Sequence, residues 1–265
     1  MRIAQISDFH IRPAGELIYG ALDTAAYLAR AVTTLNALDP QPDLVLLTGD
    51  LVDGGSDEEY VRLRQLLSPL RAPYRVIPGN HDMRDGMRRA FGADGYLPAS
   101  GEFLHYAIEE AAVRIIALDS LVPGKVWGRL CGERLAWLAA KLAAAPDRPT
   151  MIVVHHPPFP TGVAHMDAHG FEGADEFAAI VQRHSQVERV VAGHVHRAMQ
   201  MRWAGTVAST CPSTAHQFAL DLRPRQPAMW TGEPPGYQIH VWLGAAGLVT
   251  HTVAIGDYAP QPLLD

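Results

Sequence analysis

The chain has 265 residues, of which 48% are apolar and 19% charged, and its formal net charge is −6. This length suffices for one large α/β domain with a sizeable core, and the composition excludes an intrinsically disordered chain. A protein that binds nucleic acid usually carries net positive charge. Because this chain is negatively charged, we expect no long nucleic acid as a partner.

The cysteine count and the hydropathy pattern bear on the compartment. Only two cysteines are present, Cys131 and Cys211, which is typical of the reducing cytoplasm rather than of a disulfide scaffold. No run of about 18 uncharged apolar residues occurs, and the N-terminal apolar run is too short for the core of a signal peptide. We therefore expect a cytoplasmic protein that does not bind membranes.

Short apolar runs rich in β-branched residues predict six strands in the first three quarters of the chain. They cover residues 2–7, 43–49, 74–79, 113–119, 150–155 and 187–193. Apolar residues at helical spacing predict helices over 22–38, 57–70, 132–145 and 174–184. Ser56 and Asp57 are the candidate caps of the second helix. This alternation of strands and helices predicts a layered α/β fold.

The pattern changes after residue 196. Residues 198–210 and 237–255 alternate between apolar and polar side chains, which predicts antiparallel strands and hairpins. A proline-rich loop over 211–236 lies between them.

Five of the predicted strands end in Asp, Asn or His. The residues are Asp8 and His10, Asp50, Asn80 and His81, His155 and His156, and His194 and His196. Because ligands gather at the carboxyl ends of strands in α/β sheets, these side chains are expected to meet in one cleft. A glycine stands just before three of the groups and allows close approach of the backbone.

The donor atoms indicate the kind of site. Imidazole, carboxylate and amide oxygen without thiolate suit Zn, Fe, Mn or Co. Seven candidates are too many for one tetrahedral metal and fit two metals that share a bridging carboxylate; they are Asp8, His10, Asp50, Asn80, His155, His194 and His196. Each motif alone is also typical of a turn or a polar loop, but all five in order favour a metal site.

The motifs SDFH, GD, GNHD, HHP and GHVH, in this order, resemble those of the calcineurin-like metallophosphoesterase superfamily. The resemblance spans residues 3 to about 217. Segments 15–38, 57–67 and 212–218 are similar to the bacterial glycerophosphodiesterases and class III cyclic-nucleotide phosphodiesterases of that superfamily.

This resemblance implies a four-layer α/β/β/α sandwich of two mixed sheets flanked by helices, with a β-rich C-terminal part. Residues 1–210 would form the catalytic core of a single domain. Residues 211–265 would form a loop and a β-hairpin that complete the second sheet and offer a candidate oligomer interface.

The resemblance also implies which residues act at the site. One metal would be held by Asp8, His10, Asp50 and His196, and the other by Asp50, Asn80, His155 and His194, with Asp50 bridging. His81, Asp50 and Asn80 would take part in catalysis, with His81 protonating the leaving group. His81, Asn80 and His216 would contact the substrate.

The implied function is hydrolysis of small phosphodiesters, glycerophosphodiesters or cyclic nucleotides, by attack of a metal-bound hydroxide. The alternatives are a phosphomonoesterase or nuclease of the same fold, or a non-catalytic binding protein. Relatives in the subgroup assemble through the C-terminal region, which implies a homo-oligomer here, a dimer or higher. Trp203, Trp230 and Trp242 would lie in the core or at such an interface.

The sequence leaves several points open. It does not name the metals, choose between the two classes of diester, or assign roles to His156, His165 and His169. Exposed positions are favoured for the last two. Specificity is expected in the loops over 11–22, 157–173 and 211–236.

Overall fold

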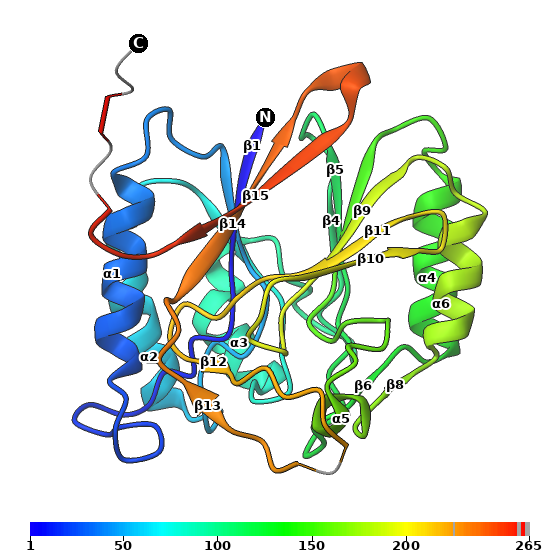
Figure 1. Ribbon diagram of the computed structural model, residues 1–265. Helices are drawn as coiled ribbons and strands as arrows, with labels where there is room; N and C mark the ends of the chain where they lie inside the picture. The colour runs from blue at the N-terminus through cyan, green and yellow to red at the C-terminus, as the bar shows by residue number, and fades with distance from the viewer. Residues whose placement is uncertain (225, 259–260, 263–265) are drawn as a thin grey trace.

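The computed structural model describes residues 1–224, 226–258 and 261–262, which contain six α-helices and two main sheets. The helices are α1 (Thr24–Asn36), α2 (Asp57–Leu67), α3 (Arg84–Phe91), α4 (Gly132–Ala143), α5 (Ala164–Asp167) and α6 (Ala174–Gln182). Helices α1, α2 and α3 cover one side of the paired sheets, and α4 and α6 cover the other (Figure 1). The predicted four-layer sandwich is confirmed.

The first sheet has the strand order β15-β14-β1-β2-β3. Its members are β1 (Arg2–Ile6), β2 (Leu44–Leu47), β3 (Tyr74–Val76), β14 (Gly236–Trp242) and β15 (Leu248–Ala254). The first three are parallel, and β14 and β15 add in antiparallel register, so this sheet is mixed.

The second sheet has the order β10-β11-β9-β7-β5-β4 and is also mixed. Its members are β4 (Tyr106–Ile108), β5 (Arg114–Ala117), β7 (Thr150–Val153), β9 (Val187–Ala192), β10 (Met199–Trp203) and β11 (Thr206–Thr210). Two strand pairs lie outside the main sheets: β6 (Gly128–Arg129) with β8 (Phe171–Glu172), and β12 (Gln217–Phe218) with β13 (Trp230–Thr231).

The C-terminal hairpin joins a different sheet from the one expected. We expected residues 211–265 to complete the second sheet, but β14 pairs with β1, and the hairpin extends the first sheet. The second sheet is completed instead by β10 and β11, which directly follow β9 in the chain. Alternation of side chains predicts a hairpin but not the strand edge to which it adds.

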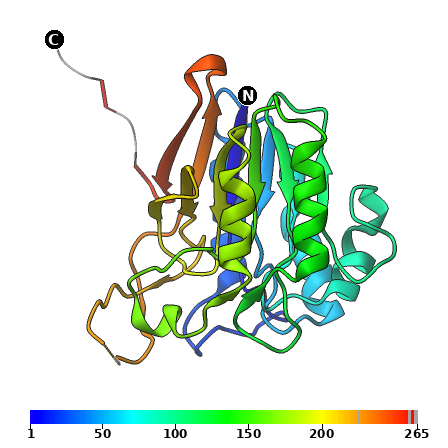
Figure 2. The same ribbon diagram turned by 90° about the vertical axis from the view of Figure 1, so that its right-hand side faces the viewer.

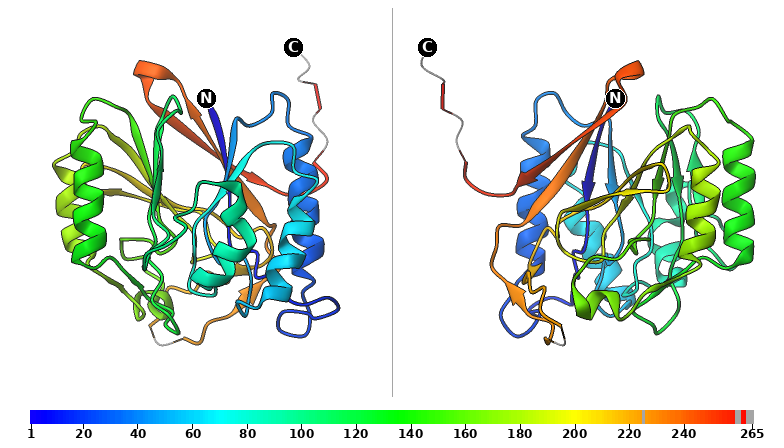
Figure 3. Two further views of the ribbon diagram at one scale, coloured as in Figure 1. Left: turned by 180° about the vertical axis from the view of Figure 1, so that it is seen from behind. Right: turned by 45° about the vertical axis from the view of Figure 1, so that its right-hand side comes forward.

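Burial explains the layers. Ile152 of β7 and Val190 of β9 form one apolar cluster with Leu138 of α4 and Phe177 of α6. Figure 2 shows α4 and α6 side by side on the face of this sheet. Seen from behind, α2 and α3 lie on the same side as α1 (Figure 3). No helix in the described part of the chain is long and apolar enough to cross a membrane.

Polar side chains join the two sheets near the ends of their central strands. The amide of Gln5, on β1, donates to Thr48 Oγ1 (3.0 Å) and to the carbonyl of Ala192 at the end of β9 (2.9 Å). Because both contacts are buried, they hold the strand ends of the two sheets in fixed relation.

All four predicted helices are present, each a few residues shorter than predicted. Ser56 is the N-cap of α2 and forms a capping box with Glu59, while Asp57 lies in the first turn. Trp203 is buried, whereas Trp230 is 40% exposed, so the three tryptophans do not share one environment.

Candidate metal centre

The five predicted polar groups meet at the carboxyl ends of β1, β2, β3, β7 and β9, at the lower edge of the sandwich in Figure 1. A pocket of about 260 Å³ opens there. Its lining includes His10, Asp50, Asn80, His81, His194, His196 and His216. All three loops in which we expected specificity contribute to its walls: Tyr19 from 11–22, His165 and His169 from 157–173, and Phe218 from 211–236.

Asp8, His10 and His196 form one cluster of donor atoms. The Nε2 atoms of His10 and His196 lie 3.1 Å apart, and His196 Nε2 is 3.6 Å from Asp8 Oδ1. Two nitrogens bound to one tetrahedral zinc lie about 3.4 Å apart. The separation of the two imidazoles therefore matches a shared metal.

His155, Asn80 and His194 form a second cluster beside the first. Asn80 Oδ1 lies 3.2 Å from His155 Nε2 and 2.9 Å from His194 Nδ1. The two imidazoles are buried, while Asn80 is partly exposed at the floor of the pocket.

Asp50 lies between the two clusters. Its Oδ2 atom is 3.7 Å from His10 Nε2 and 3.4 Å from His155 Nε2. Its other oxygen, Oδ1, accepts the backbone N–H of His81 (2.9 Å). One carboxylate oxygen is thus oriented toward both sets of imidazoles, as the bridging position requires.

The backbone at these residues is unusual. Seven non-glycine residues in the described part of the chain have a positive φ, and five of them are predicted ligands: Asp8 (58°), His10 (47°), Asp50 (49°), His194 (71°) and His196 (50°). A left-handed conformation costs a non-glycine residue about 1–3 kcal/mol, and such residues concentrate at functional sites. Folding alone gives no reason for this concentration, which fits residues held in place to bind an ion.

The neighbouring glycines have a steric reason. A Cβ atom on Gly79 would lie 2.2 Å from the backbone nitrogen of Asp50, and one on Gly193 would lie 2.1 Å from Ser7 Oγ. One on Gly49 would lie 2.4 Å from His155 Nδ1. The absence of a side chain therefore allows the strand ends to approach closely enough for the clusters to form.

His155 and His156 have different partners. Both fall in a group of donor atoms with His194, but His156 uses both nitrogens elsewhere: Nδ1 accepts from Ser120 Oγ (2.7 Å) and Nε2 donates to the carbonyl of Val126 (3.1 Å). His155 donates from Nδ1 to the carbonyl of Thr48 (2.7 Å), which directs Nε2 into the site. The contacts favour His155 as a ligand, and His156 supports the loop that carries Val126.

Burial and the Asp50 carboxylate together set the protonation of the buried imidazoles. Burial lowers the pKa of His194 to about 3 and that of His196 well below its usual value, so both rings are neutral at pH 7. Burial also acts to lower the pKa of His155, but the Asp50 carboxylate outweighs it and raises that pKa to about 9. A metal binds neutral imidazole, so binding at His155 displaces a proton.

The donor set therefore fits two hard or borderline metal ions. It combines imidazole nitrogen, carboxylate oxygen and an amide oxygen, in clusters that share one carboxylate. Asp8 and Asp50 are the only carboxylates among the seven candidate residues, so two divalent ions would leave the centre positively charged.

Two contributors to the site were not predicted. Asp53 Oδ1 lies 3.4 Å from His10 Nδ1, and its backbone carbonyl accepts from His81 Nδ1 (2.7 Å). In the sequence, the one indication that Asp53 belongs to the site is its position three residues after Asp50. Val126 lines the pocket from the loop that follows β5, and nothing in its local sequence indicates this.

His216 is brought to the centre as predicted. Its ring lies 4.5 Å from that of His196 and 5.9 Å from that of His10, measured between centroids. Both ring nitrogens are buried without a hydrogen-bond partner in the described part of the chain. A buried polar group without a partner is costly, so this ring is suited to meet a polar ligand in the pocket.

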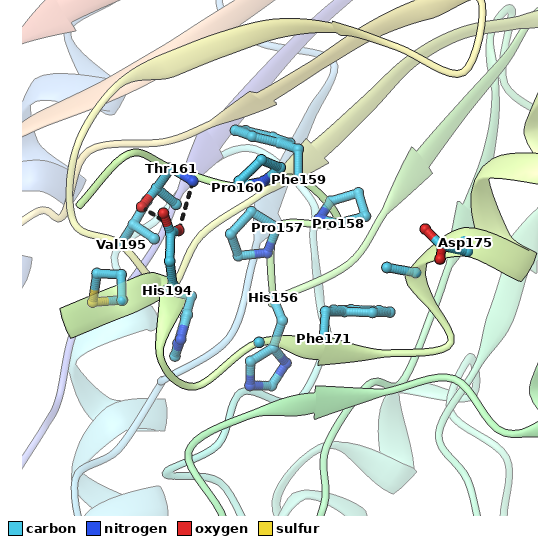
Figure 4. A pocket seen from close by; sticks show the side chains of 14 residues that line it. His156, Pro157, Pro158, Phe159, Pro160, Thr161, Phe171, Asp175, His194 and Val195 are labelled. Atoms are coloured by element: carbon cyan, nitrogen blue, oxygen red, sulfur yellow. Dashed lines mark hydrogen bonds between the residues drawn. The ribbon is translucent and has the colours of Figure 1, made fainter. Parts of the chain in front are cut away.

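A second pocket of about 250 Å³ is lined largely by the loop over 157–173 (Figure 4). Pro157, Pro158, Phe159 and Phe171 line it, and it reaches His194. Thr161 is fixed there by Asp167, which accepts its backbone N–H (2.7 Å) and its hydroxyl (2.8 Å). Asp167 thus shapes the loop. His165 and His169, for which exposed positions were favoured, both line the metal-centre pocket, and His169 is also exposed.

Comparison with known proteins agrees with the fold and the site. A family model described as calcineurin-like phosphoesterase matches residues 1–198. The chain belongs to this family. Calcineurin-like phosphoesterases are metal-dependent enzymes, so the chain is a metallophosphoesterase whose paired clusters suit the metals of the family.

Curated relatives extend the similarity over most of the chain. A probable glycerophosphodiester phosphodiesterase GpdQ of Arcobacter nitrofigilis is 38% identical over 264 residues, covering 99% of this chain and 96% of that protein. The 3′,5′-cyclic adenosine monophosphate phosphodiesterase CpdA of Escherichia coli K12 is 33% identical over 222 residues, covering 82% and 78%.

Among solved structures, a dimetal phosphatase from Danio rerio superposes with a TM-score of 0.67. The alignment covers 97% of this chain and 99% of that one at 16% identity. At this identity the match supports the calcineurin-like fold alone.

Proposed function

We propose that the chain is a dinuclear phosphodiesterase that hydrolyses small phosphodiesters, either glycerophosphodiesters or cyclic nucleotides. The position of Asp50 Oδ2 between His10 and His155 carries the proposal, because it makes one carboxylate common to two metal positions. The substrates named for the curated relatives support the choice of diesters.

The ligand assignment is part of the proposal. Asp8, His10, Asp50 and His196 hold one metal, and Asp50, Asn80, His155 and His194 hold the other. Iron, zinc, manganese and cobalt all suit these donors. When bound, two such ions activate a water molecule and offset the charge that develops on the phosphate.

The chain's own residues then bind and orient the diester. Burial lowers the pKa of His216 to about 3, so the ring is neutral and offers one N–H to a phosphate oxygen. His81 is fixed by its backbone N–H on Asp50 and by Nδ1–H on the Asp53 carbonyl. Its Nε2 atom is left for the pocket, where a protonated ring can donate to the departing oxygen.

A substrate panel tests the proposal. We expect the purified enzyme to contain two metals per chain and to hydrolyse bis(p-nitrophenyl) phosphate faster than p-nitrophenyl phosphate. A chelator should abolish both activities. Faster monoester hydrolysis would favour a phosphomonoesterase, and binding of diester without turnover by the metal-loaded protein would favour a binding protein.

Two further expectations belong to the same proposal. Location in the cytoplasm is supported by Cys131 and Cys211, both of which are free thiols. Assembly into a dimer or a higher homo-oligomer is measured by light scattering of the metal-loaded protein.

A further inference from the structure

Tyr19 is an exposed aromatic residue that lines the pocket at its mouth, and a second exposed aromatic side chain, Trp230, lies next to it. Their rings are nearly parallel (12°), with centroids 6.2 Å apart. Tyr19 is 60% exposed and Trp230 is 40% exposed. In Figure 1 the loop that carries Tyr19 lies beside β13, which begins at Trp230.

The aromatic pair continues a row of rings that starts at the metal centre. His216 contacts His196 on one side, and on the other its ring lies 5.4 Å from that of Tyr19 in edge-to-face geometry. A diester whose phosphate meets His216 would therefore place its next group against Tyr19. The pocket, at about 260 Å³, is smaller than most ligand sites, so a large substituent must extend to the mouth.

Tyr19 is held at the tip of a tight, anchored turn. Its φ is 53°, and the flanking Ile18 and Leu22 exchange two backbone hydrogen bonds of 3.0 Å. Arg62 donates to the carbonyls of Arg12 (2.7 Å) and Pro13 (2.6 Å) at the base of the loop. A strained backbone that presents a large aromatic ring to solvent does not serve the core.

Trp230 is fixed by a strand pair that reaches the metal centre. It pairs with Phe218 across the β12–β13 ladder, and the Phe218 ring stacks on that of His196 with centroids 4.4 Å apart. The turn restrains Tyr19, and the β12–β13 ladder restrains Trp230. Because both side chains are already held in place, less entropy is lost when a ligand stacks on them.

We propose that Tyr19 and Trp230 form a stacking subsite for the nucleobase of a cyclic nucleotide, which rests on the proposed diester hydrolysis at the metals. Near-parallel rings suit a flat ligand with two π-faces. A centroid separation of 6.2 Å is too short to admit a base between the rings, because two stacked layers need about 7 Å. The base would therefore stack on the faces that Tyr19 and Trp230 expose to solvent.

A quaternary ammonium group, such as the choline of a glycerophosphodiester, is the competing occupant. The charges near the mouth disfavour it. Arg12 lines the same pocket, and the nearby carboxylates of Glu16 (3.1 Å) and Asp53 (3.6 Å) are already paired with its guanidinium. A cation would meet a positive side chain and no free carboxylate among these groups.

The test compares two diesters in the metal-loaded enzyme: 3′,5′-cyclic AMP, which has a base, and glycerophosphoethanolamine, which has no ring. The variants are Tyr19→Leu, Trp230→Leu and their combination, which keep apolar bulk and remove the π-face. Loss of one base–aromatic stack weakens binding by about 5- to 150-fold. We divide kcat/KM for 3′,5′-cyclic AMP by kcat/KM for glycerophosphoethanolamine. This ratio should fall by that factor in each single variant.

Controls separate stacking from general damage. Tyr19→Phe and Trp230→Phe should retain most of the ratio, because the ring remains. Tyr258→Leu, which removes another exposed aromatic side chain, should retain it entirely. Inhibition by 5′-AMP should exceed inhibition by ribose 5-phosphate in the parent enzyme, and the difference should disappear in the double variant.

The outcomes distinguish this inference from the proposed function. If the parent enzyme hydrolyses no diester, the proposed function fails. If it hydrolyses diesters and the leucine variants leave the ratio unchanged, only the stacking subsite is overturned. A selective loss on glycerophosphocholine overturns it in favour of a quaternary ammonium site. A change of oligomeric mass in Trp230→Leu without a change of ratio overturns it in favour of an interface between copies of the chain.

Discussion

Asp50 Oδ2 lies 3.4 Å from Nε2 of His155, a contact that joins the first sheet to the second. Because the same oxygen lies 3.7 Å from His10 Nε2, removing it should weaken both metal positions. We expect Asp50→Ala to lose more than about 100-fold in affinity for both ions, beyond the 10–100-fold typical of residues that only orient ligands. Metal content after dialysis measures this, and Asp57→Ala, at an exposed ion pair with Arg89, should retain two metals. Two tightly held ions in Asp50→Ala would exclude the bridging role.

Asp8 should affect one metal selectively. Asp8→Ala removes a proposed ligand from the cluster of His10 and His196 and no proposed ligand from the cluster of His155. It also leaves the buried N–H of His194 without its acceptor, which costs about 1–3 kcal/mol and is less than the stability of a typical domain. Metal titration should show one tight and one weak site, with a folded circular dichroism spectrum. Global unfolding would indicate instead that Asp8 is structural.

His155 and His156 should separate metal binding from support of the pocket wall. His155→Ala should lose metal from the second position. His156→Ala should retain both metals but lose about 1–3 kcal/mol of stability, because the Ser120 hydroxyl and the Val126 carbonyl lose a buried partner. Metal analysis and thermal unfolding of both variants check this. If only His156→Ala lost metal, His156 would be the ligand and His155 the residue that supports the pocket wall.

The strand ends could be predicted because buried parallel strands leave a strong sequence pattern. Each apolar run before Asp8, Asp50 or His194 is short, and the polar residue marks its end. Helix α3 was missed because Arg84–Phe91 contains four charged residues and few apolar ones, so packing against α2 decides its structure. The position of Val126 could not be predicted either, because it depends on a contact between residues far apart in the chain. A hydrogen bond from His156, thirty residues later, fixes it.

Gly79 tests the close approach of β3 to Asp50. A Cβ atom there would lie 2.2 Å from both the backbone nitrogen and Oδ1 of Asp50, so Gly79→Ala must displace the Asp50 carboxylate, which we propose bridges the two metals. We expect metal affinity and kcat to fall at least 10-fold. Gly132→Ala, in the first turn of α4, should leave both unchanged, because beyond the helix backbone and the adjacent residues no described atom lies within 4 Å of its Cβ position. Normal metal binding in Gly79→Ala would show that the site tolerates this displacement.

His81 should matter most when the leaving group needs a proton. The departing alkoxide of glycerophosphoethanolamine is a poor leaving group, whereas p-nitrophenolate leaves without protonation. We therefore expect His81→Ala to lower kcat about 10²–10⁴-fold on the first diester, the range typical of a general acid, and far less on bis(p-nitrophenyl) phosphate. His251→Ala, at an exposed histidine on β15, serves as the control. An equal loss on both diesters would mean that His81 only binds the phosphate. In that case His81 Nε2 would donate a hydrogen bond without transferring its proton.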